Sequence, residues 1–83
     1  MKIILRPSSR HGEEDLRNII QGYINTFDDL NNDRLVVYCD NDKVVIEENE
    51  DSRQQVDDDT FRFLKEEIER EFSADFNLIE VRD

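Results

Sequence analysis

The chain has 83 residues, enough for one small domain, 1–83, with a single thin core. It holds 22 acidic and 11 basic residues and has a net charge of −11, so its field repels nucleic acid and anionic membranes and attracts basic proteins. Direct nucleic-acid binding is therefore not expected, no stretch is apolar enough for a transmembrane helix, and we expect a cytoplasmic protein.

The beginning of the chain predicts a strand and then a helix. Lys2–Arg6 (KIILR) is a short apolar run closed by Pro7, a residue that cannot donate to a central strand ladder. From Glu13 to Phe27 the apolar residues recur at helical spacing. Acidic residues fill the first turn, where the positive end of the helix dipole favours them. A polar turn, Asp28–Asp33, follows.

Two runs rich in β-branched residues then predict a hairpin. Arg34–Asp40 and Lys43–Glu48 are separated by Asn41 and Asp42, a two-residue turn. The predicted register pairs Asp40 with Lys43, Cys39 with Val44, and Val37 with Ile46. One face of this hairpin is apolar and consists of Leu35, Val37, Cys39, Val44 and Ile46. The other face is less polar than an ordinary solvent face and carries Val36, Tyr38 and Val45.

The last third predicts a second helix and a final strand. Phe61, Leu64, Ile68 and Phe72 fall at helical spacing. Asp57–Thr60 supplies candidate N-caps, and Val56 precedes them where a hydrophobic staple residue is expected. Phe76–Arg82 (FNLIEVR) completes the order β-α-β-β-α-β. This order predicts an α+β fold of the ferredoxin-like split βαβ type, with two helices on one face of a four-stranded antiparallel sheet. Right-handed crossovers place the first and third strands in the middle.

No group of residues predicts catalysis. His11 lies in the Ser8–Gly12 loop close to Arg10, but three acids follow at once and no glycine-rich phosphate loop is present. Cys39 stands on the predicted core face beside Asp40, whose charge disfavours a thiolate. We therefore expect no enzymatic activity.

No resident metal ion or other cofactor is predicted either. The acidic turns at 28–33 and 40–42 begin like calcium loops but have neither the central glycine nor the glutamate at the twelfth place. A single cysteine excludes an internal disulfide and a cysteine-based metal cluster.

The acidic charge is concentrated in the second half of the chain. Residues 1–39 have six acids and five bases, whereas residues 40–83 have sixteen acids and six bases. Residues 47–59 (EENEDSRQQVDDD) form the densest run. We expect a partner-binding surface made of Asp40, Asp42, Glu47, Glu48, Glu50, Asp51, Asp57, Asp58, Asp59, Glu66, Glu67, Glu69 and Glu71.

The partner that suits this surface is a basic protein, above all one that binds nucleic acid. A duplex 30 Å long carries about 18 phosphate charges, so a protein of this size imitates roughly one face of one turn. Our leading hypothesis is a small inhibitor of the phage or mobile-element type. It mimics nucleic-acid charge and occupies the basic site of a DNA- or RNA-processing or defence protein. An alternative that uses the same acidic surface is an immunity or antitoxin-like protein that neutralises a basic nuclease.

A family resemblance adds a third candidate. INTFDD (24–29) and EREFSADF (69–76) resemble stretches of the DNA-damage-inducible small regulators of the recombinase RecA, which are similar in size and acidity. The resemblance implies regulation of a RecA-type recombinase, although this chain adds a strand after its second helix. A further alternative is a homodimer formed through the candidate dimer face Val36, Tyr38 and Val45. That homodimer would be a structural or designed domain in which the acids only maintain solubility.

Overall fold

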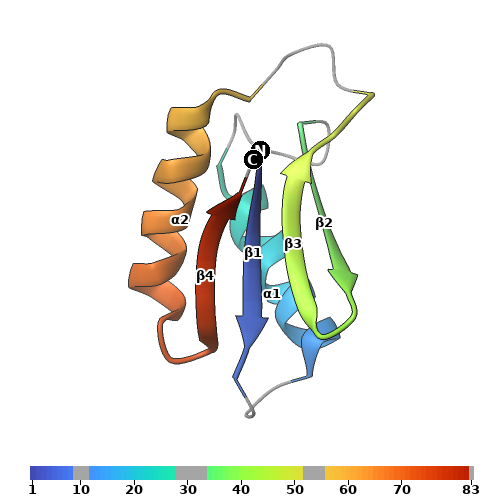
Figure 1. The fold of residues 1–83 in the computed structure, drawn as a ribbon, viewed down its shortest axis with the longest axis vertical. Coiled ribbons are helices and arrows are strands. Elements are labelled where there is room, and N and C mark those ends of the chain that lie inside the picture. The colour runs from blue at the N-terminus through green and yellow to red at the C-terminus, as the bar shows by residue number, and fades with distance from the viewer. Residues whose placement is uncertain (9–11, 28–33, 52–55, 83) are drawn as a thin grey trace.

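The computed structural model describes residues 1–8, 12–27, 34–51 and 56–82, and it has the predicted order of elements. Strand β1 (Lys2–Pro7) leads to helix α1 (Glu13–Asn25), and strands β2 (Leu35–Asp40) and β3 (Lys43–Glu48) form the hairpin. Helix α2 (Asp58–Phe72) and strand β4 (Phe76–Arg82) complete the chain (Figure 1). Three predicted features lie outside the described residues: the His11 loop, the Asp28–Asp33 turn and the middle of the acidic run.

The four strands form one antiparallel sheet in the order β2-β3-β1-β4, so β1 and β3 are central and β2 and β4 are the edges. The hairpin register is the predicted one, with Asp40 opposite Lys43 and Val37 opposite Ile46. Asn41 at the turn has a φ of 58°, a left-handed conformation that asparagine tolerates better than most residues.

Both helices bury their apolar stripes on the same face of the sheet. The core includes Ile3 and Leu5 of β1, each 0% exposed, together with buried side chains of α1 and of α2. Helix α1 packs against β2 and β3, and α2 packs against β4 and β1 (Figure 1). Burial of apolar area against water is the main force that holds these layers together.

The start of α2 follows its sequence prediction closely. Asp57 is the N-cap, and its carboxylate accepts a hydrogen bond from the Thr60 backbone N–H at 2.9 Å. Val56 and Phe61 are both buried in the core, as expected for a residue before the cap and its staple partner within the first turn.

Two sequence expectations about the hairpin need correction. Cys39 was expected in the apolar core face but is only partly buried, because it lies next to the tip of an edge strand. Val45, on the opposite face, was expected to be available to a partner but is only 3% exposed. Its register neighbours are Tyr38 and Ile4, and the flanking Lys43 and Glu47 have long aliphatic stems of the kind that cover apolar surface.

The left-handed conformation at Asn41 makes a stability prediction. Replacing Asn41 by Ala should lower the free energy of unfolding by about 1 kcal/mol, because the β-carbon of alanine disfavours positive φ without the compensating local hydrogen bonds of asparagine. Replacing it by Gly should leave stability unchanged or raise it, because glycine accepts positive φ without a steric cost. Urea denaturation of the three proteins gives the comparison, and equal loss in both variants would contradict this reading of the turn.

Candidate functional site

The predicted acidic residues do not form one continuous cluster. The hairpin tip, with Asp40 and Asp42, lies at one end of the sheet, whereas α2 begins at the other end (Figure 1). Glu47 lies on the sheet face opposite the helices, between Val36 of β2 and Lys2 of β1 in the register. The predicted set is therefore divided among the hairpin tip, the open sheet face, and the region around α2.

At the hairpin tip the fold adds acids that the sequence prediction did not include. A shallow hollow at this end is lined by Pro7, Ser8, Glu13 and Asp42. Glu13 and Glu14 belong to the first turn of α1, so the helix start and the hairpin tip form one acidic end. The start of α1 and the hairpin tip are far apart in the sequence. They come together only because α1 packs on the hairpin.

Cys39 lies close to this acidic end and is not activated as a nucleophile. Burial raises the pKa of its thiol, and the charges of Glu13 and Glu14 raise it further, while Arg17 only partly opposes them. A thiol with a raised pKa stays protonated at neutral pH and is a poor nucleophile.

At the other end of the molecule, two of the predicted acids have roles within the fold. Glu48 accepts a hydrogen bond from the Val56 backbone N–H at 2.6 Å, which joins the end of β3 to the residue before the α2 cap. Asp57 accepts bonds from both the backbone N–H and the hydroxyl of Thr60. These bonds hold both carboxylates in place, so Glu48 and Asp57 stabilise the fold and are less available to a partner.

Several exposed acids beside this junction are accessible to a partner. Asp58 and Asp59 follow the cap, and a shallow hollow is lined by Val56, Asp57, Asp58, Asp59 and Arg62. Arg62 approaches Asp59 at 3.8 Å, but both side chains are exposed, so solvent screens the attraction strongly. Glu50 and Asp51, just after β3, are exposed as well.

Further along α2, most acids are balanced by bases on the same helix. Lys65 pairs with Glu69, and Arg70 pairs with Glu67 and approaches Glu71 at 3.8 Å. Glu66 is exposed and has no ion pair with another described residue. Asp58 and Glu66 are therefore the acids of this helix that have no ion pair with another described residue.

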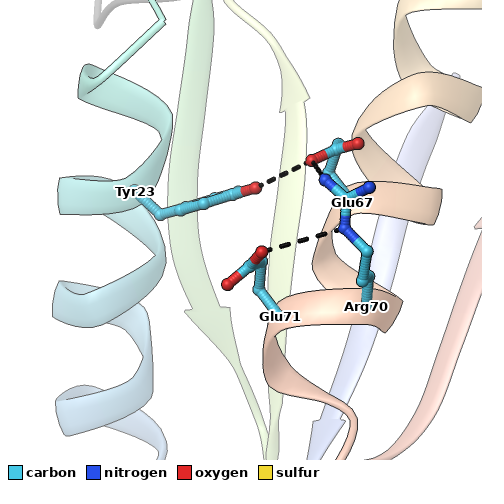
Figure 2. Close-up of polar contacts among 4 residues, drawn as sticks. All are labelled: Tyr23, Glu67, Arg70 and Glu71. Carbon is cyan, nitrogen blue, oxygen red and sulfur yellow. Dashed lines mark hydrogen bonds and ion pairs between the residues drawn. The ribbon is translucent and has the colours of Figure 1, made fainter.

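Glu67 also connects the two helices. The Tyr23 hydroxyl of α1 points toward α2 and donates to Glu67 Oε2 at 3.4 Å, and Arg70 contacts the same carboxylate (Figure 2). Tyr23 packs edge-to-face on Phe27 and Phe72, with ring centroids 5.3 and 5.1 Å apart. The side chain of Glu67 is only 18% exposed, so this predicted binding residue is a part of the helix–helix contact.

The described part of the chain shows neither a metal site nor a membrane helix. Within these residues no group of three or more His, Cys, Asp or Glu side chains is arranged to hold a metal ion. Neither helix described here is long and apolar enough to cross a bilayer.

No protein family, curated protein or solved structure matches this chain.

The cap at Asp57 makes a prediction about acid stability. Hydrogen bonds from the Thr60 hydroxyl and backbone N–H lower the pKa of Asp57 below its ordinary value of 3.8. The stabilisation by the charged cap is thus present above that value and is lost as the pH falls through the lowered folded-state pKa. Asp57→Asn keeps a capping side chain but cannot titrate, so acid unfolding followed by circular dichroism should depend less steeply on pH in the variant. An unchanged acid profile would contradict the assignment.

The Tyr23–Glu67 contact makes a prediction about alkaline titration. Burial raises the pKa of Tyr23 above 10.0, and the charge and hydrogen bond of Glu67 raise it further. Glu67→Gln should therefore lower the pKa of Tyr23. The measurement is an ultraviolet titration on a Tyr38→Phe background, where Tyr23 is the one remaining tyrosine.

Glu66→Gln provides the matched control for this titration. It removes the same charge from the same helix at an exposed position. Equal shifts of the Tyr23 pKa in both variants would mean that the effect comes from net charge and not from the contact.

Proposed function

We propose that this protein acts by binding a basic, nucleic-acid-binding protein through the acids at the start of α2, and that it inhibits that protein by occupying its nucleic-acid site. We define the α2 acidic surface as Asp58, Asp59 and Glu66, with Glu50 and Asp51 at its margin. The observation that carries the proposal is the unequal distribution of charge over the two faces of the sheet.

The open face of the sheet has nearly balanced charge. Its register positions include the bases Lys2, Arg6, Lys43 and Arg82 and the acids Asp40, Glu47 and Glu80. The helix layer is different, because α2 has six acids and three bases, and α1 has three acids and one base. A partner with a positive site is thus attracted to the helix side, where acids outnumber bases.

The size of the helix layer supports nucleic-acid mimicry on a small scale. Helix α2 has 15 residues and is about 22 Å long at 1.5 Å per residue. The molecule extends 37 Å along its longest axis. A surface of this size covers the length of roughly one duplex turn, which matches a basic groove that holds a short stretch of backbone phosphates.

The proposed surface excludes the acids that the fold already uses. Reversing Asp57 would remove the α2 cap, and changing Glu48 or Glu67 would disturb main-chain or helix–helix contacts. Binding experiments on those residues would confuse lost folding with lost recognition. Asp58, Asp59 and Glu66 avoid this problem because they are exposed.

The decisive experiment compares two triple neutralisations that change net charge equally. Asp58→Asn/Asp59→Asn/Glu66→Gln removes the α2 acidic surface, and Asp42→Asn/Glu13→Gln/Glu14→Gln removes the same charge at the hairpin end. In capture from a host lysate at low salt, we expect wild type and the hairpin-end variant to retain nucleic-acid-binding proteins. The α2 variant should lose them, and high salt should release them because the attraction is screened. Capture of no basic protein at low salt, or equal loss in both variants, would refute the proposal.

Competition separates the inhibitor from the immunity-type alternative. Duplex DNA should displace this protein from a captured partner if both occupy the same basic site. A captured nuclease that is neutralised without competition from DNA would instead favour the immunity or antitoxin-like function. Retention of a RecA-type recombinase would support the function that the family resemblance implies.

For the architecture, we infer the ferredoxin-like split βαβ class. Read from its other edge, the sheet order is β4-β1-β3-β2 with antiparallel neighbours. The support for this class is the combination of that order with two helices on one face.

A further inference from the structure

The edge strand β2 has a row of backbone groups that point away from the sheet. The Arg34 carbonyl accepts a hydrogen bond from the Asn49 N–H at 2.8 Å, so position 34 faces the β3 side. Because main-chain groups alternate along a strand, Val36, Tyr38 and Asp40 also face β3. Leu35, Val37 and Cys39 therefore direct their N–H and C=O groups outward.

A contact from α1 agrees with this direction. Arg17 Nε of α1 donates to the Val37 carbonyl at 3.1 Å, as a carbonyl that no β3 group engages can accept. A carbonyl oxygen has two lone pairs, so this bond leaves Val37 able to accept a second one. An outward row of this kind is a template for pairing with another strand.

The sequence of β2 is complementary to itself when a second copy is placed antiparallel, with Val37 opposite Val37. In this register Leu35 faces Cys39 of the second copy, so the N–H and C=O groups of all three outward residues are paired. Arg34 faces Asp40 of the second copy at both ends of the ladder. Shifting the register by two positions leaves outward groups unpaired and separates Arg34 from Asp40. The backbone pairing and the charge pairing thus select the same register.

We propose that this protein forms a symmetric dimer by antiparallel pairing of β2 with β2 of a second copy, which makes one continuous eight-stranded sheet. Val36 and Tyr38 are each partly buried within one chain. In the selected register, Val36 lies directly opposite Tyr38 of the second copy, on the open face. Such pairs of an aromatic and a β-branched residue stabilise neighbouring antiparallel strands. The dimer therefore uses Val36 and Tyr38 at a sheet edge and does not need the buried Val45.

The salt dependence distinguishes this dimer from binding to a basic partner. Each copy has a net charge of −11, so the two copies repel each other at low ionic strength, and added salt screens that repulsion. Salt also weakens the two Arg34–Asp40 pairs, but the repulsion between copies of net charge −11 outweighs them, so self-association should become tighter as salt rises. Binding of a basic protein should become weaker.

Charge exchange tests the pairing. In sedimentation velocity over a range of concentrations, at about 0.15 M and about 0.5 M salt, wild type should dimerise reversibly. Arg34→Asp and Asp40→Arg should each raise the dissociation constant at least about tenfold, because each places like charges opposite one another at both ends of the ladder. The double exchange should restore dimerisation to within about threefold of wild type. A monomeric wild type at its highest soluble concentration, or a double variant no better than the single ones, would overturn the proposal.

Disulfide trapping tests the register without changing these charges. Val36→Cys and Tyr38→Cys are made separately on a Cys39→Ser background. Opposed positions of this type are about 4.5 Å apart between α-carbons, within disulfide reach. An oxidised mixture of the two variants should form a covalent dimer, because position 36 of one copy is opposite position 38 of the other. Each variant alone should not cross-link, because its cysteine is displaced by two residues along the ladder from the same cysteine in the second copy. Equal cross-linking in each variant alone would reject the register.

Discussion

The apolar layer between the sheet and the two helices is the constraint on which the rest of the molecule depends. In the described part of the chain every buried side chain is apolar, and Ile3 and Leu5 of the central strand are 0% exposed. A chain with a net charge of −11 gains no stability from its overall field, because like charges favour expansion. Burial of this single layer must offset both that repulsion and the chain entropy. The acids are therefore confined to the surface, and their number alone is weak support for a binding site.

The useful distinction among these acids is between those that the fold already engages and those that it leaves to solvent. Glu48 is bonded to the main chain, Asp57 caps a helix, and Glu67 joins Tyr23 to Arg70. Desolvating such groups further against a partner would disturb contacts that the fold uses. Asp58 and Glu66 carry no such cost. The number of acids in the sequence therefore exceeds the number that the fold leaves available to a partner.

Local patterns predicted most of the fold because the interactions behind them are local. The two-residue turn at Asn41 and Asp42 set the hairpin register, and the spacing of Phe61, Leu64 and Ile68 identified α2 and its buried stripe. Asp57 and Val56 marked its beginning. These features depend on residues only a few positions apart, where backbone geometry determines which side chains share a face.

Contacts between residues far apart in the chain were not predictable in the same way. Tyr23 and Glu67 are 44 positions apart, and Arg17 and Val37 are 20 apart. No local spacing connects either pair. The arrangement of the acids was therefore only partly predictable: their place at the start of α2 followed from the sequence, but the approach of Glu13 to the hairpin end did not. The burial of Val45 was also missed, because it depends on neighbours in three strands.

The geometry of the sheet allows both proposed interactions to occur in one molecule. Strand β2 is one edge, and α2 packs on β4 and β1 toward the other. Pairing through β2 therefore leaves both α2 acidic surfaces free and places them toward the outer edges of the eight-stranded sheet. A partner with two basic sites at a matching spacing would then bind the dimer more tightly than a single copy, because the second contact forms within the same complex. If salt strengthens the proposed dimer and weakens the proposed contact with the partner, this gain should be greatest at intermediate ionic strength, where neither interaction is lost.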